Sequence, residues 1–227
     1  MSLVISQLIN GLQSGSIYAL VALGYSMVYG IIMLLNFAHG DIIMVGAYVA
    51  WLAMVHLALS PILAIILAII ACTLLGVIIE KVAYTPLRSS PRLSLLITAI
   101  GISFLLENLA QLIFKADAKR VPPLITGPSI NIAGQYVDFT AIITIVVSVI
   151  SMILLTFLVR KTKMGKAMRA VSEDMVTAQL MGINLNSTIS FTFAVGSALA
   201  GIGSILYCCT YPQASPTMGS MLGLKAF

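Results

Sequence analysis

The sequence predicts an all-α, polytopic transmembrane helical bundle with about six spans, forming a single membrane domain over residues 1–227. Of the 227 residues, 60% are hydrophobic and 8% are charged, whereas soluble domains carry about 25% charged residues. Apolar runs of about 20 residues recur along the chain, which is the helix length that crosses a bilayer and favours helices over a β-barrel. Together these observations indicate an integral membrane protein.

The apolar runs place the spans in order. The first, at 4–35, follows a start that lacks the basic region and the small-residue cleavage site of a secretory signal, so we expect it to be retained. A tight turn at Ser60 and Pro61 separates the second span from the third. The later spans are expected at about 42–59, 62–80, 94–114, 139–159 and 189–209.

The segment 115–138 differs from the other connections because turn residues interrupt it repeatedly. Pro-Pro at 122–123, Gly-Pro at 127–128 and a polar turn near 131–134 alternate with Ile and Val. This pattern is typical of a small β-hairpin or an ordered loop outside the bilayer. We therefore predict an extracytoplasmic loop over 115–138.

Basic residues give the orientation. The loop 80–92 holds three Lys or Arg residues and the loop 160–169 holds five, against three in 115–138. Cytoplasmic loops carry the excess of positive charge, so eight against three places the first two loops, and with them the whole segment 160–188, in the cytoplasm. The net charge of +5 then reflects these loops and not nucleic acid binding. The N-terminus is expected to face outward.

The most polar stretch inside the apolar part of the chain is 36–41, with Asn36, Phe37, His39, Gly40 and Asp41. Polar groups at membrane depth are costly and usually face a cavity, a pathway or another helix. We predict that 36–41 breaks the helix, with Gly40 turning at positive φ, and borders a translocation pathway near its cytoplasmic end. Two alternatives remain open: a polar turn at the membrane surface, and a structural role in which His39 and Asp41 tie neighbouring helices together.

A second polar feature, Glu107 and Asn108, lies well inside the fourth expected span. An ionised carboxylate facing lipid there costs about 2.5–3.5 kcal/mol. We expect Glu107 to face the bundle and to be hydrogen-bonded with Asn108 or another polar partner. A structural role is favoured over contact with a substrate.

The segment 173–184 follows the most basic stretch of the chain. Its composition predicts an amphipathic cytoplasmic helix over 173–180, with Gly182 as the residue that ends it. A short helix between two spans suits docking into the groove of a partner. A solvated surface helix is the alternative.

The chain contains little enzyme chemistry. It has no Gly-Lys-Ser/Thr phosphate loop and no serine in a nucleophile elbow. A metal site cannot be built from His39 and Asp41 without further ligands, and the other histidine, His56, is distant. The three cysteines lack metal-ligand spacing, and we interpret them as small buried hydrophobic residues. We therefore expect no catalytic residue and no metal. An intramembrane hydrolase built on His39 is the alternative from another class.

Several stretches, in the same order along the chain, resemble one transporter family. They are 15–20 (Gly-Ser-Ile-Tyr-Ala-Leu), 24–31 (Gly-Tyr-Ser-Met-Val-Tyr-Gly-Ile), 36–41 (Asn-Phe-Ala-His-Gly-Asp), 80–84 (Glu-Lys-Val-Ala-Tyr), 86–90 (Pro-Leu-Arg-Ser-Ser), and the segment from 164–165 through Ala178 to 182–184. On these stretches the sequence resembles the permease subunits of ABC importers for branched-chain amino acids (the leucine, isoleucine and valine system). The Asn-Phe-Ala-His-Gly run is among the most specific of them.

The resemblance implies a function, an assembly and a place in the cell. The chain would form the translocation pathway of an ATP-driven importer in a bacterial-type inner membrane. Its partners would be a second permease, usually related but distinct, two cytoplasmic ATPases and an extracytoplasmic binding protein. It would hold no cofactor itself, because ATP and Mg would be bound by the ATPases. Importers of urea or short-chain amides share the same motifs and are the alternative within the class.

The resemblance also assigns the cytoplasmic segment, which would dock on the ATPase. The residues expected to couple the two subunits are Glu173, Asp174, Ala178, Gly182 and Asn184. Asp174 and Met175 stand where other ABC importers commonly have small residues. In the family the chain continues past residue 227 into a glycine-rich segment and further spans, so C-terminal spans are expected to be missing here.

Overall fold

The structure is a computed structural model that describes residues 2–32, 36–88, 90–132 and 135–226. Six of the described helices are long and apolar enough to cross a membrane, which confirms the expected number of spans in this part of the chain. They are α1 (Ser2–Ile32), α2 (Ala38–Val55), α3 (Pro61–Ile79), α4 (Arg92–Phe114), α5 (Phe139–Lys161) and α8 (Leu185–Thr210).

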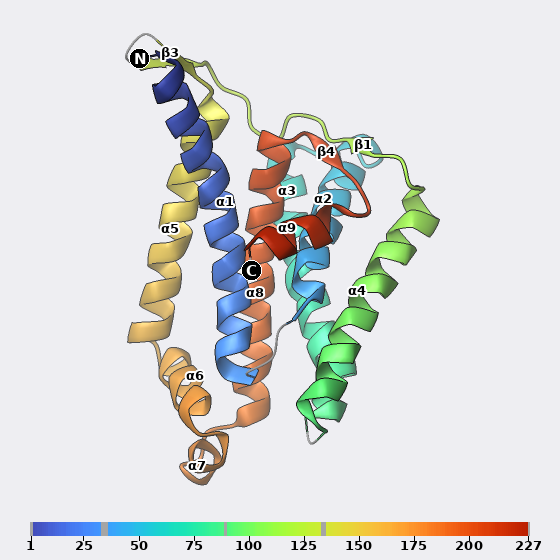
Figure 1. The fold of residues 1–227 in the computed structure, drawn as a ribbon, viewed down its shortest axis with the longest axis vertical. Helices are drawn as coiled ribbons and strands as arrows, with labels where there is room; N and C mark the ends of the chain where they lie inside the picture. The colour runs from blue at the N-terminus through green and yellow to red at the C-terminus, as the bar shows by residue number, and fades with distance from the viewer. Residues whose placement is uncertain (1, 33–35, 89, 133–134, 227) are drawn as a thin grey trace.

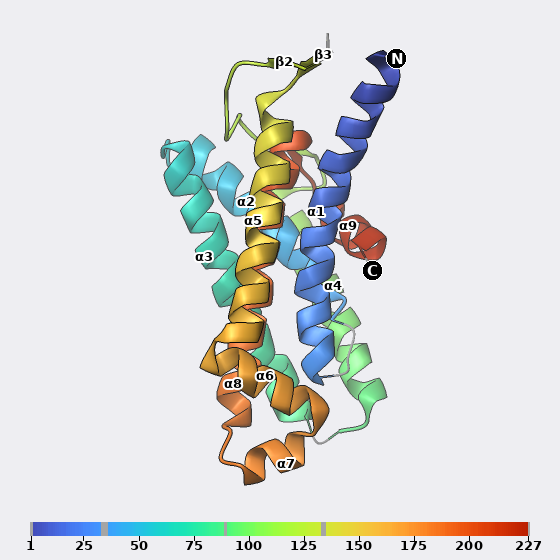
Figure 2. The same cartoon turned by 90° about the vertical axis from the view of Figure 1, so that its left-hand side faces the viewer.

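The connections gather at the two ends of the bundle (Figure 1). At one end the hairpin of β2 (Ile130–Ile132) and β3 (Gln135–Val137) lies with the N-terminus, and it confirms the hairpin predicted in 115–138. The opposite end carries α6 (Lys163–Glu173) and α7 (Met175–Leu180), as Figure 2 also shows. The two loops expected in the cytoplasm, 80–92 and 160–188, therefore lie at one end, and the N-terminus lies at the other.

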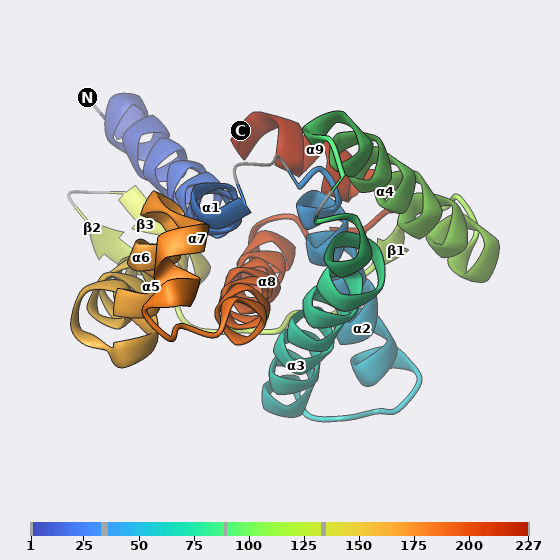
Figure 3. The ribbon, with the colours of Figure 1, turned by 90° about the horizontal axis from the view of Figure 1, so that it is seen from below.

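The bundle is organised around α8. Seen from the end that carries α7, this helix lies between α1 on one side and α2 and α3 on the other (Figure 3). Its buried face is rich in small residues, and Ser197 lies against Gly76 of α3. Small residues allow helix backbones to approach closely, which is how helices pack where lipid removes the hydrophobic drive to associate.

The segment 80–92, predicted to be a polar loop, is largely helical. Pro61 opens α3 after the extended Ser60, and the helix runs past Ile79 as a π-helical turn, η1 (Glu80–Tyr84), and a 3₁₀ turn, η2 (Thr85–Leu87). The prediction of a polar loop was wrong because the polar residues Glu80 and Tyr84 are buried against neighbouring helices and do not face solvent.

The segment 160–188 forms two helices between α5 and α8, where one was predicted. α6 ends at Glu173, and α7 begins only at Met175 because Asp174 has an extended backbone and caps the new helix. Thr162 and Asn184 cap α6 and α8 in the same way, each accepting a hydrogen bond from a backbone N–H in the first turn. Glu173 is therefore the last residue of the basic helix and not the first residue of the next one.

Two elements near the C-terminal end of the chain were not predicted. β4 (Gln213–Ala214) pairs antiparallel with β1 (Lys119–Arg120), which joins the segment after α8 to the loop after α4. The short helix α9 (Met218–Ala226) then crosses the bundle roughly perpendicular to the spans, near the middle of their length (Figure 1).

Only part of the predicted break at 36–41 is non-helical, and it lies inside the bundle. Residues 33–35 lie outside the described residues; Asn36 and Phe37 are not helical, but Ala38 to Asp41 form the first turn of α2. α1 ends close to the α7 end of the bundle, whereas α2 begins near the middle of its length (Figures 1 and 2). The start of α2 therefore lies inside the bundle, and the position of 36–41 along a translocation pathway stays a prediction.

Candidate functional site

Asn36 joins the start of α2 to the end of α3. Its side-chain oxygen accepts a hydrogen bond of 2.8 Å from the Tyr84 hydroxyl, and both residues are buried. Its carbonyl accepts from the backbone N–H of His39 at 3.0 Å, which fixes the first turn of α2. The amide therefore acts as a connector between two spans.

His39 packs between helices. Its ring lies 4.7 Å from the ring of Tyr25 on α1, centroid to centroid, and the side chain is buried. Its Nε2 has no hydrogen-bond partner among the described residues. Nothing in this environment resembles the base and nucleophile of a hydrolase, and the described residues contain no group of three or more His, Cys, Asp or Glu that could hold a metal.

Gly40 is helical, so the predicted positive φ is wrong; among the described glycines only Gly182 has one. Gly40 is instead required for a close approach, because a Cβ there would overlap the backbone carbonyl of Gly219 on α9. A Cβ on Gly219 would in turn lie 2.6 Å from the Gly40 carbonyl oxygen. The two glycines thus set the contact between α2 and α9.

Asp41 is fully buried beside this contact. Neither carboxylate oxygen has a hydrogen-bond partner among the described residues. The side chain lies next to Ser103 of α4 and close enough to Glu107 for the two carboxyl groups to interact electrostatically. A buried carboxyl group without a basic partner is expensive to keep.

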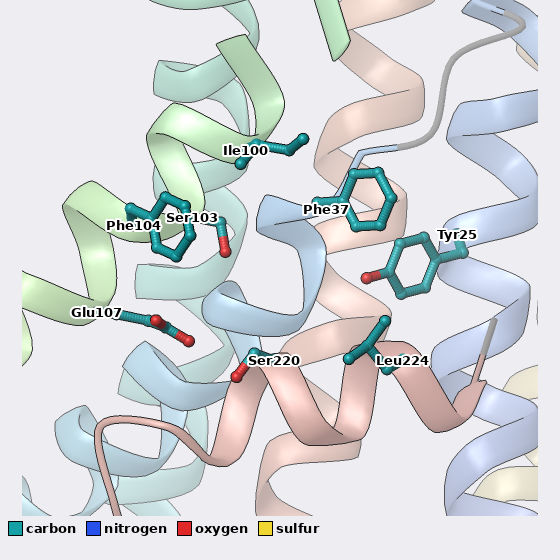
Figure 4. Close-up of a pocket in the computed structure, with 8 residues that line it drawn as sticks. All are labelled: Tyr25, Phe37, Ile100, Ser103, Phe104, Glu107, Ser220 and Leu224. Atoms are coloured by element: carbon teal, nitrogen blue, oxygen red, sulfur yellow. The ribbon is translucent and has the colours of Figure 1, made fainter. Parts of the chain in front are cut away.

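A pocket of about 240 Å³ lies between α1, α4, α9 and the start of α2 (Figure 4). Its apolar wall is formed by Phe37, Ile100, Phe104 and Leu224. Its polar groups are those of Tyr25, Ser103, Glu107 and Ser220.

Of the predicted residues, Phe37 and Glu107 meet in this pocket, which places Glu107 toward the bundle as expected. The expected pairing with Asn108 is wrong: the Asn108 amide donates to the carbonyl of Phe104 on its own helix, at 2.7 Å, and its side chain is exposed. No sequence signal predicted that α9 would complete the pocket, since the short run after Pro216 has no strong periodicity.

The predicted coupling residues lie together at the α7 end of the molecule. Asp174 accepts hydrogen bonds from the backbone N–H groups of Val176 and Thr177 and from the Thr177 hydroxyl. The hydroxyl and the two amides hold the pKa of Asp174 below its ordinary value, so this exposed group stays charged near neutral pH. Its negative charge also suits the N-terminus of a helix.

Gly182 ends α7 as predicted. Its φ is +84°, its N–H bonds to the carbonyl of Gln179, and the next N–H, of Ile183, bonds to the carbonyl of Ala178. This pair of bonds is the Schellman arrangement, which satisfies the last carbonyls of a helix. Ala178 is buried, and Asn184 then caps α8, so a single turn links the exposed helix to the central span.

Sequence reasoning missed a buried polar group at the same end. Glu80 is fully buried, forms an ion pair with Arg88, and accepts from the hydroxyls of Thr85 at 2.8 Å and of Ser190 at 2.6 Å. Arg88 also donates to the side chain of Asn186. The available signal was the carboxylate directly after a long apolar run, followed by an arginine eight residues later.

This ion pair borders a cavity of about 580 Å³ under α7. Arg88 lines it together with Gln179 and Gly182 and with the first turn of α8. The cavity, the ion pair and the α7 cap therefore form one continuous region between the exposed helix and the spans.

Comparison with known proteins identifies a family. The family model for the branched-chain amino acid transport system permease component matches residues 7–227. The high-affinity branched-chain amino acid transport system permease protein BraD of Pseudomonas aeruginosa is 39% identical over 98% of this chain and 76% of its own length. The permease protein LivH of Escherichia coli K12, of the same description, is 38% identical with the same coverage.

A more distant relative comes from an archaeon. The probable branched-chain amino acid transport permease protein LivH of Methanocaldococcus jannaschii is 29% identical over 82% of this chain and 61% of its own length. No solved structure matches the chain.

Proposed function

Because the chain belongs to the family of branched-chain amino acid transport permeases, we propose that it forms the pathway of an ATP-driven importer for these amino acids. The observation that carries the proposal is similarity over almost the whole chain to two permeases of that description. The proposal is consistent with the six helices that are long and apolar enough to cross a membrane. The inner membrane of a bacterial-type cell is the location that such an importer requires.

The partners in this proposal are a second, related permease, two cytoplasmic ATPases and an extracytoplasmic binding protein. The ATPases would bind ATP and Mg, and this chain would hold no cofactor and catalyse no reaction. The surface of α7 supports the ATPase contact. Val176, Leu180 and Met181 are 69%, 82% and 79% exposed on a helix outside the spans. Such apolar side chains on a short helix suit a groove in a partner.

Force applied to α7 has a direct route into the bundle. The Schellman turn at Gly182 and the cap at Asn184 connect α7 to α8 without a flexible linker. The hydrogen bond between Asn186 and Arg88, and the bonds of Glu80 to Arg88 and Ser190, tie the first turns of α8 to the end of α3. When the ATPase dimer closes, α3 and α8 would move together.

The pathway in this proposal passes the start of α2. Asn36, His39 and Gly40 hold this turn against η1, α1 and α9, so they shape the path and do not line it. Phe37 faces the pocket, and Asp41 lies buried behind it. The gate that 36–41 was predicted to form would therefore depend on Phe37 and on α9, with the other residues as its support.

The experiment is uptake by the reconstituted transporter. The chain is co-expressed with the second permease, the ATPases and the binding protein proposed as its partners, purified through a tag on this chain, and placed in proteoliposomes. We expect the ATPases to co-purify and radiolabelled leucine to accumulate only when ATP and binding protein are both supplied. An assembled complex that hydrolyses ATP but accumulates none of leucine, isoleucine or valine would overturn the assignment of substrate.

A further inference from the structure

The pocket between α1, α4 and α9 combines a carboxylate with an apolar wall. Figure 4 shows the side chains of Glu107 and Ser220 and the hydroxyl of Tyr25 directed into the same space, from three different helices. Phe37, Ile100 and Leu224 surround them. An apolar pocket with a few convergent polar groups is the usual form of a site for a small molecule.

Among the described residues, the carboxyl group of Glu107 has no ion-pair partner. Among the described residues that line the pocket no side chain is basic, and no described Lys or Arg forms an ion pair with Glu107. Asp41 lies close by, beside Ser103 and without an ion-pair partner among the described residues, and it adds a second acidic group. Acidic groups inside spans are normally paired or mark a path for an ion or substrate. A cationic group on a ligand would supply such a partner.

The other groups restrict what that cation can be. The Ser220 hydroxyl donates to the carbonyl of Thr217 at 3.1 Å, which leaves its oxygen lone pairs free to accept from a donor in the pocket. The volume of about 240 Å³ is roughly the share of eight water molecules. A small organic ammonium with an apolar side chain fits this combination; a bare metal ion would leave the apolar wall unused.

We propose that this pocket is a transient binding site for the amino acid in transit, in which Glu107 accepts the α-ammonium group and the apolar wall receives the side chain. The inference rests on the proposed function. Glu107 is then a specificity-determining residue of the pathway and not only a structural one. A single charge contact gives weak binding, which a pathway needs in order to release its substrate.

The test uses the complete transporter in proteoliposomes with one reporter cysteine, Ser220→Cys. A small water-soluble thiol reagent labels this position, and the rate is measured with and without leucine, in the absence of binding protein. The parent protein gives the background, because Cys72 and Cys208 are buried and Cys209 is half-buried. We expect millimolar leucine to slow labelling and isocaproate, which is leucine without its amino group, to have no effect.

Two further variants separate the charge from the fold. In Glu107→Gln the leucine concentration that halves the labelling rate should rise about tenfold, the equivalent of about 1.4 kcal/mol. Asn108→Ala is the matched control on the same helix, because the Asn108 side chain bonds only to its own helix backbone, and it should leave protection unchanged. If Ser220→Cys fails to assemble, Ile100→Cys on the opposite wall replaces it.

Equal protection by leucine and isocaproate, or protection by leucine that survives Glu107→Gln, would overturn the proposal. So would a labelling rate that leucine does not change in a transporter that accumulates leucine normally, and this result would leave the proposed function intact. Loss of leucine uptake by the parent transporter, in the same proteoliposomes, would count against the proposed function itself.

Discussion

Individual residues in this protein connect spans by polar contacts that cross from one helix to another. Tyr84 reaches Asn36, and Glu80 holds Arg88 and Ser190. A buried ion pair of this kind is weak evidence for net stability, because desolvation offsets the attraction. Its clearer consequence is geometric: with three hydrogen-bonded partners, Glu80 fixes the end of α3 relative to the start of α8.

At this scale the sequence identified the unusual residues but not their roles. Asn36, His39, Asp41 and Glu107 were recognisable because polar groups are rare inside apolar segments. Which of them line a cavity and which tie helices together depends on contacts with residues far along the chain, and no periodicity records those contacts. Glu80 was missed for the same reason, since its partner Ser190 is 110 positions away.

The contact between Gly40 and Gly219 gives a prediction at the residue scale. Gly40→Ala places a methyl group against the Gly219 carbonyl, so either α9 moves or α2 bends. Overpacking of this kind costs about 1–3 kcal/mol. We expect the thermal midpoint of the purified transporter to fall. Gly101→Ala is the control, because a Cβ at Gly101 has nothing within 4 Å. Equal midpoints for the two variants would show that α9 does not pack on α2 as described.

Elements were predictable where composition alone defines them. The six spans and the hairpin of β2 and β3 follow from apolar length and turn residues. The split of the segment 160–188 at Asp174 was not predicted, although aspartate is a preferred N-cap, because an amphipathic pattern continues across it. α9 was not predicted because its position depends on packing against α2.

The end of α7 gives a prediction at the scale of the element. Gly182→Val forces a β-branched residue into the left-handed region, which costs about 1–2 kcal/mol and disrupts the turn that joins α7 to α8. We expect ATP hydrolysis to continue while the amount of leucine transported per ATP falls, with normal insertion of the protein. The measurement is the ratio of uptake to hydrolysis in proteoliposomes.

Gly182→Asn is the matched variant for this experiment, because asparagine tolerates the left-handed conformation at a helix C-terminus. It should keep most of the coupling. A steric clash would not account for a difference in coupling between the two variants, since a Cβ at Gly182 would meet no atom within 4 Å. Normal coupling in Gly182→Val would show that the turn at Gly182 does not transmit movement from the ATPase to the pathway.

Most basic residues of the connections lie at one end of the molecule, and the sequence predicted this distribution. α5 ends in Arg160 and Lys161, and α6 continues the basic run, at the same end as η1 and η2 (Figures 1 and 2). The depth at which α2 begins could not be predicted. An apolar sequence contains no signal for how deep in the bundle a connection ends and the next helix starts.

This arrangement predicts the orientation of the protein in the membrane. By the excess of positive charge the α6 and α7 end faces the cytoplasm, and the hairpin end, which carries the N-terminus, faces outward. Asp117→Cys and Lys166→Cys are exposed reporters for the two ends. With a membrane-impermeant maleimide, Asp117→Cys should label in intact spheroplasts and Lys166→Cys only in inverted vesicles. The parent chain controls for its own cysteines. The opposite pattern would place α7 outside the cell, where no ATPase could reach it, and would contradict both the orientation and the proposed docking of α7.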